Sequence, residues 1–257
     1  MRRSVAPFHS LLADPQTPIS TGRFIFYRHQ DILHPTEVAP FLNSMDTQTR
    51  AHTVLTVLKT IFPNPAPSLT FSNNWELIVS VVLSAQTTDK QVNVVTKKLF
   101  HTYPTLDHYL GTSLDQFTKD LSAIGLYKTK AKNILAAAHI LDTQFHRVVP
   151  QTIAELILLP GVGRKTANVV LGNAYGIAEG IAVDTHVTRL AQKFKLTKHR
   201  DPKKIEQDLM HIFPKEEWFL LTMRLIEYGR EYSPARKKDD DTDPISIALR
   251  KATKTGP

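Results

Sequence analysis

The stretch LPGVGRKTANVVL, residues 159–171, places two glycines in a tight turn that runs directly into a helix-forming segment. Glycine permits a positive φ and leaves the neighbouring backbone amides uncovered. These amides lie at the start of a helix, where the dipole is positive, so the turn can hold one phosphate without reading a base. The alternative interpretation is an ordinary αα-hairpin within a core.

Helical patterns lie on both sides of this turn. Residues 75–86 are apolar on nearly every side, which predicts a buried central helix capped by Asn73 or Asn74. Residues 89–100 and 129–142 repeat apolar residues at helical spacing.

Helix-start signals continue through the rest of the chain. Thr152 and Glu155 form a capping-box pair, and Asp184 stands where the N-cap of a later helix is expected. Asp201 and Pro202 open another helix, and a last long one is expected to end near Gly229. No segment has a credible strand pattern, so the sequence predicts an all-α fold.

The composition is that of an ordinary globular protein with a basic charge balance. Of 257 residues, 42% are hydrophobic and 22% charged, and the formal net charge is +8. This balance suits a polyanionic partner such as nucleic acid. No apolar run approaches the roughly 18 residues that span a bilayer. The chain has no cysteine, which excludes disulfides, thiolate metal sites and cysteine nucleophiles.

The basic residues gather in one short segment. Six Lys or Arg stand between Lys193 and Lys204, against one acid, Asp201. A phosphate-contacting surface and a solvated loop are both open interpretations.

Lys165 and Asp184 are the candidate catalytic residues. Lys165 lies in the first turn after the hairpin, where the helix dipole and Arg164 disfavour a charged amine. A lysine must lose its proton to act as a nucleophile. Asp184 follows 19 residues later at a helix start, where the dipole favours the carboxylate. Taken singly, a solvated lysine and a helix cap are the ordinary interpretations.

Five stretches together resemble the endonuclease III branch of the helix–hairpin–helix DNA glycosylases. They are LSAQTTDKQVN, IGLYKTKAKNI, LPGVGRKTANVVL, IAVDTH and the GR–ARK run near 229–237, in family order over about residues 46–238. The resemblance implies the helix–hairpin–helix DNA glycosylase fold, with two helical domains and the active site in the cleft between them. It also implies a bifunctional DNA glycosylase/AP lyase of base excision repair.

The resemblance carries roles onto individual residues. Lys165 matches the Schiff-base lysine and Asp184 the carboxylate that assists it. Gln86 matches the residue that fills the gap left by a flipped base, and Leu126 matches the wedge that parts the opposite side. A polar helix end and a core leucine are the ordinary interpretations of these two. The remaining DNA-binding residues are expected to be Gly161, Gly163 and Arg164.

The substrate class also follows from the resemblance. Lysine rather than serine after LPGVGR argues against the adenine-mispair branch, so we expect removal of oxidised pyrimidines and strand nicking by β-elimination. The partner would be double-stranded DNA with damaged bases or abasic sites, bound by a monomer without membrane association. A non-catalytic helix–hairpin–helix DNA-binding protein and a monofunctional or mismatch-specific DNA glycosylase are the alternatives.

The C-terminus departs from the family, most of whose members carry a 4Fe–4S cluster on four cysteines spaced C-x6-C-x2-C-x5-C. Those positions are Ser233, Asp240, Asp243 and Leu249, so no such cluster is expected. We interpret the acidic run 239–243 as solvated and expect the segment to be restructured or disordered. Apolar packing in the place of the cluster is expected from Ile245, Ile247 and Leu249. No other cofactor is expected, apart from a candidate monovalent cation at the hairpin.

Four segments are therefore expected. Residues 1–45 are expected to be a Pro-rich N-terminal extension, poorly ordered or loosely packed, and they show no convincing signal peptide. The protein is expected to be intracellular and DNA-associated, in the cytoplasm or nucleoid. Residues 67–177 form a six-helix domain with the hairpin. Residues 46–66 and 178–238 form a second helical domain, and 239–257 is a tail that replaces the iron–sulfur loop.

Overall fold

The computed structural model describes residues 45–236 and 241–254, and every regular element within these ranges is a helix. The prediction of an all-α fold is confirmed. The elements, in chain order, are α2 (Thr47–Ile61), α3 (Asn74–Ser84), α4 (Asp89–Thr102), α5 (Leu106–Gly111), α6 (Leu114–Asp120), α7 (Tyr127–Gln144), α8 (Ile153–Leu156), α9 (Arg164–Tyr175), α10 (Thr185–Lys193), α11 (Pro202–Ile212), the 3₁₀ helix η1 (Lys215–Glu217), α12 (Trp218–Glu231) and α13 (Pro244–Lys254). The expected extension over 1–44 and the acids Asp239 and Asp240 lie outside the described residues.

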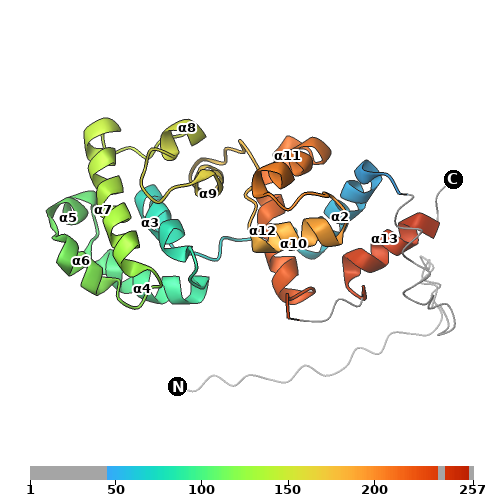
Figure 1. Ribbon diagram of the computed structural model, residues 1–257, viewed down its shortest axis with the longest axis horizontal. Helices are drawn as coiled ribbons and strands as arrows, with labels where there is room; N and C mark the ends of the chain where they lie inside the picture. Colours follow the sequence, from blue (N-terminus) through green and yellow to red (C-terminus); the bar gives the residue numbers. More distant parts are fainter. Residues whose placement is uncertain (1–44, 237–240, 255–257) are drawn as a thin grey trace, which may run out of the picture.

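Buried hydrophobic side chains form two separate clusters, and Figure 1 shows the helices that carry them as two groups. Helices α3 to α9 surround the first, which we call the first lobe. Helix α2 joins α10 to α13 around the other, the second lobe, and α2 packs directly on α13 although the two helices lie at opposite ends of the described chain. The division into domains 67–177 and 46–66 with 178–238 stays a prediction, which the two clusters support.

Helix α3 is the centre of the first lobe. Every residue from Glu76 to Leu83 is buried, and the helix contacts α4, α7 and α9. Of the two candidate caps, Asn73 is the one that acts, because its side-chain oxygen accepts a hydrogen bond from the Glu76 amide at 2.9 Å. This buried helix ends at Ser84, with Ala85 as its C-cap, so Gln86 stands on the surface two residues beyond the helix.

Residues 67–177 contain seven helices where the sequence analysis expects six. The chain between α4 and α7 is divided at Gly111–Thr112, and Ser113 begins α6 by accepting the Gln116 amide at 3.2 Å. The Thr152 capping residue is also confirmed, since its hydroxyl accepts the Glu155 amide at 3.2 Å. The helix that it begins, α8, is a single turn.

The second lobe follows the predicted helix starts. Asp184 caps α10, and Asp201 caps α11 with Pro202 as its first residue. Helix α12 continues to Glu231, slightly past Gly229. Within the described ranges, no helix is both long and apolar enough to cross a membrane.

The C-terminal segment forms a helix, α13. Ile245 and Leu249 are buried, as expected, but Ile247 is 38% exposed and the prediction of a packing role for it is wrong. Residues four apart share a helix face, while the residue between them points the other way.

Candidate active site

The hairpin uses its two glycines differently. Gly161 has a φ of +86°, and a Cβ there would lie 3.2–3.3 Å from atoms of Asn133 and Val82. Gly163 is extended, with φ −95°, so only Gly161 of the two uses the positive φ that glycine permits. A Cβ at Gly163 would meet nothing within 4 Å, so this residue leaves open space in front of α9.

No side chain caps the start of α9. Gly163 occupies the N-cap position, and no side chain accepts a hydrogen bond from the amides of the first turn. The first helical hydrogen bond runs from the Ala167 amide to the Gly163 carbonyl at 2.9 Å. The preceding amides have no partner within the helix, and Gly163, Arg164 and Lys165 are exposed. An accessible, positively polarised helix end results.

The sequence suggests that the charge of Arg164 acts on the amine of Lys165, but in the structure Arg164 is paired with another residue. Its guanidinium forms a two-point salt bridge with the buried Glu206 of α11, at 2.7 and 3.1 Å. This hydrogen bonding raises the pKa of Arg164. The positive charge is therefore paired within the protein and ties the first lobe to the second, while Lys165 points into solvent from the first turn of α9.

Asp184 begins α10 in the second lobe. The residue is half-buried, and its Oδ1 atom accepts a hydrogen bond from the Val187 amide at 2.8 Å. Among the described residues, no hydrogen bond is made to its second oxygen, so the carboxylate keeps one acceptor after capping the helix.

Gln86 and Leu126 are both exposed and both have positive φ, +54° and +58°. Leu126 is 58% exposed, which rules out the interpretation as a core leucine. The loops that carry them touch, because a Cβ on Gly125 would lie 3.4 Å from the Gln86 carbonyl oxygen. The structure therefore brings these two predicted residues together.

Sequence reasoning missed Lys130. Its ammonium is buried and donates to the carbonyls of Leu83 and Ala85, at 2.9 and 2.6 Å, and to the Thr87 hydroxyl at 3.0 Å. A signal was present: Lys130 stands four residues before Ile134, on the apolar stripe of its helix.

An open hollow of about 870 Å³ lies beside the residues that follow Gln86 and Asp184. Its lining includes Thr87 and Lys90 from the first lobe and His186 and Arg230 from the second. Arg230 crosses between the lobes to bond Asp89 at 2.6 Å. Burial lowers the pKa of His186. The Nδ1 atom of His186 is buried without a hydrogen-bond partner in the described part of the chain.

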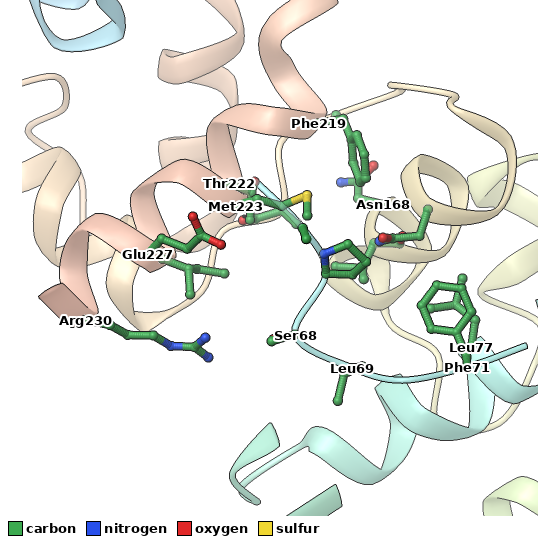
Figure 2. Close-up of a pocket in the computed structure, with 17 residues that line it drawn as sticks. Ser68, Leu69, Phe71, Leu77, Asn168, Phe219, Thr222, Met223, Glu227 and Arg230 are labelled. Carbon is green, nitrogen blue, oxygen red and sulfur yellow. Dashed lines mark hydrogen bonds between the residues drawn. The ribbon is translucent and has the colours of Figure 1, made fainter. Parts of the chain in front are cut away.

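A smaller cavity of about 110 Å³ lies between α12 and α9 (Figure 2). Phe219 and Met223 of α12 face Asn168 of α9 across it, and the segment 66–71 closes one side. Neither Lys165 nor Asp184 lines this cavity. This cavity is therefore not formed by the predicted catalytic pair.

The residues at the family's cluster positions do not fit an iron–sulfur cluster. Ser233 accepts hydrogen bonds from Arg189 through its hydroxyl and its carbonyl, and Leu249 is buried among apolar side chains. Asp240 lies outside the described residues. None of these side chains is a thiolate, and no group of three or more His, Cys, Asp or Glu that could hold a metal occurs in the described ranges.

Asp243 is buried, which corrects its interpretation as part of a solvated acidic run. Its carboxylate pairs with Lys193 at 2.9 Å and accepts hydrogen bonds from Tyr228 and Ser246. Burial by itself raises the pKa of Asp243, but these hydrogen bonds together hold it below its usual range. Lys193 is correspondingly removed from the exposed basic segment.

Comparison with known proteins agrees with this geometry. The family described as "HhH-GPD superfamily base excision DNA repair protein" matches residues 79–215. Endonuclease III of Synechocystis sp. is 42% identical over 188 residues, which cover 73% of this chain and 86% of that protein. A solved non-covalent endonuclease III–DNA complex is 39% identical, covers 82% of this chain and 98% of its own, and has a TM-score of 0.75. A trapped endonuclease III–DNA covalent intermediate is 40% identical, with coverages of 78% and 94% and a TM-score of 0.74.

The all-helical fold, the glycine hairpin before Lys165 and these similarities agree along most of the described chain. The chain belongs to the endonuclease III family of the HhH-GPD superfamily of base excision DNA repair proteins, a family of DNA glycosylase/AP lyase enzymes.

Proposed function

We propose that the chain binds double-stranded DNA, removes oxidised pyrimidines through a Schiff base on Lys165, and nicks the strand by β-elimination. The observation that carries the proposal is the exposed position of Lys165 on the first turn of a helix that no side chain caps, two residues after a glycine with open space in front of it. The uncovered amides would hold a DNA phosphate next to the nucleophile. Gly161, Gly163 and the backbone of Arg164 would form this contact, while the Arg164 side chain stays with Glu206.

The chemistry would proceed in two stages. The damaged nucleotide is first flipped out of the helix, because its glycosidic bond cannot be reached within the stack. The uncharged amine of Lys165 attacks C1′ of the deoxyribose, and the base leaves with the bonding electron pair. Asp184, in its carboxylate form, stabilises the positive charge that develops on the sugar. The attached nitrogen then gives up a proton as the C1′–O4′ bond breaks, which leaves an iminium at C1′ and a hydroxyl group on C4′. Loss of a 2′ proton from this iminium expels the 3′ phosphate.

We also propose that the enzyme carries no 4Fe–4S cluster and that α13 occupies the place of the cluster loop. The absence of cysteine removes the usual ligands, and the buried Lys193–Asp243 pair supports a packed alternative. A monovalent cation at the hairpin remains a prediction. Both lobes of the cleft come from one chain, which supports a monomer, and an intracellular, DNA-associated location follows from the proposed substrate.

Borohydride trapping tests the proposed chemistry. Purified protein is incubated with duplexes that contain an abasic site, thymine glycol or a G·T mismatch, and the products are resolved with and without the reductant. We expect a covalent adduct on the abasic and thymine glycol duplexes, and its loss in Lys165→Ala, with Lys128→Ala as the control at another exposed lysine. An adduct that persists in Lys165→Ala would identify another amine. Base release without nicking or adduct would identify a monofunctional enzyme.

A further inference from the structure

Lys130 is a buried ammonium that the proposed chemistry does not use. Its side chain is 4% exposed, and its three protons go to three neutral oxygens, on Leu83, Ala85 and Thr87. Burial lowers the pKa of Lys130. Two of the acceptors are carbonyls at the carboxyl end of α3, where the helix dipole is negative and free carbonyls need partners.

The three acceptors lie on both sides of Gln86. Residues 83 and 85 precede it and Thr87 follows it, so the ammonium spans the one residue in this loop with a positive φ. A left-handed conformation at a residue other than glycine persists only where its surroundings enforce it. Lys130 supplies such a constraint from outside the loop.

The same lysine is tied to Leu126 through its own backbone. The Lys130 amide donates to the Leu126 carbonyl at 3.1 Å, in the first turn of α7. Leu126 is the second exposed residue with a left-handed backbone in this region, and a Cβ on the neighbouring Gly125 would lie 3.4 Å from the Gln86 carbonyl oxygen. Lys130 therefore connects, through one side chain and one turn of helix, the two loops that project from this surface.

We propose that Lys130 is a positioning residue that holds Gln86 and Leu126 as one rigid pair for opening the DNA duplex around a lesion. It touches neither DNA nor the reacting atoms, and it acts through the geometry of the two exposed side chains. The proposal rests on the proposed function, because it assumes that these two side chains enter the DNA. Base opening needs both side chains at a set separation, since a small misplacement of a positioning group is enough to cost a large factor in rate.

The test separates base opening from chemistry. Lys130→Met keeps an unbranched side chain one atom shorter and removes the three hydrogen bonds. Lys132→Met is the control at an exposed lysine of the same helix. Excision of thymine glycol is measured in a fully paired duplex and in a bubble where the lesion has no partner. We expect Lys130→Met to lose roughly 10- to 100-fold on the paired duplex and little on the bubble. Lys132→Met should match the wild type on both.

Other outcomes overturn the proposal. An equal loss on both substrates would mean that Lys130 only supports the fold, and no loss on either would mean that the loops do not depend on it. If Lys130→Met does not fold, Thr87→Val removes one of the three acceptors and should give a smaller loss with the same preference for the bubble. If the wild type neither excises nor forms an adduct on either substrate, the proposed function is rejected. If the wild type is active but the variants lose equal activity on the paired duplex and the bubble, only this inference is rejected.

Discussion

The ammonium of Lys193 lies 2.9 Å from the carboxylate of Asp243, and both side chains are buried, with exposed fractions of 9% and 4%. Lys193 ends α10 and Asp243 precedes α13, so the pair joins the C-terminal helix to the body of the second lobe. The Tyr228 hydroxyl of α12 donates to the same carboxylate. One buried carboxylate thus connects three helices at the end of the chain.

Asp243 should make the free energy of unfolding depend on pH in the acid range. Because its folded-state pKa lies below the ordinary value of about 3.9, its contribution is present above that value and is lost as the pH falls through the folded pKa. Asp243→Asn should lower the free energy of unfolding by about 3 kcal/mol at neutral pH, since it removes the carboxylate that pairs with the buried Lys193 ammonium. Melting curves of both proteins from pH 6 to pH 2.5, in steps of about half a unit, should converge at the acid end.

A double variant serves as the control for this pair. Lys193→Met with Asp243→Leu replaces both charges with apolar groups and should recover most of the lost stability. Equal melting curves for the wild type and Asp243→Asn across the range would show that the carboxylate does not secure α13.

The two hairpin glycines should respond differently to alanine. Gly161→Ala places a Cβ at positive φ against Asn133 and Val82, and it should cost about 1–2 kcal/mol of stability. Gly163→Ala meets nothing in the protein and should leave the melting temperature unchanged or slightly raised. If the open space before α9 takes a phosphate, the same Gly163→Ala variant should bind abasic duplex more weakly in a fluorescence anisotropy titration. Unchanged affinity would place the phosphate elsewhere.

Asp184→Asn separates the cap from the catalytic role. Asparagine caps helices as well as aspartate, so the hydrogen bond from Val187 should survive and the melting temperature should change little. Loss of the negative charge should slow single-turnover base release by about 100-fold or more. A variant with normal turnover would reduce Asp184 to a structural cap.

The exposed part of the basic segment should contribute to the salt dependence of DNA binding. Alanine replacement of Lys198, Arg200, Lys203 and Lys204, all exposed, should flatten the slope of log affinity against log salt by up to about 0.9 for each lost phosphate contact. Lys215→Ala, a lysine outside this segment, is the control. An unaltered slope would place the four charges away from the DNA.

Local signals in the sequence predicted most of the fold. A cap depends on residues three apart, so Asn73, Asp184 and Asp201 could be found from the chain itself. The hairpin and the exposed Lys165 could be found in the same way. Long-range pairing could not be predicted. Arg164 and its partner Glu206 stand 42 residues apart in the sequence, and only the fold brings them together.

The same limit explains the errors at charged positions. Lys193 and Asp243 stand in runs of like charge, which are typical of solvated segments, and only the folded chain brings them together. Lys130 binds carbonyls 45 and 47 residues away, and carbonyls leave no trace in the sequence. Its place on an apolar stripe shows that it is unusual but does not identify its partners.

Gly172 lies on the last turn of α9, where an added methyl group would stand 1.9 Å from the ring of Phe219 on α12. Lys165 occupies the first turn of the same rigid helix. A larger residue at this contact would push α9 away from α12 and shift the amine of Lys165 relative to the second lobe. If Lys165 is the nucleophile, as proposed, a natural variant at position 172 would be recorded as a loss of catalysis although it lies about two helical turns from that amine.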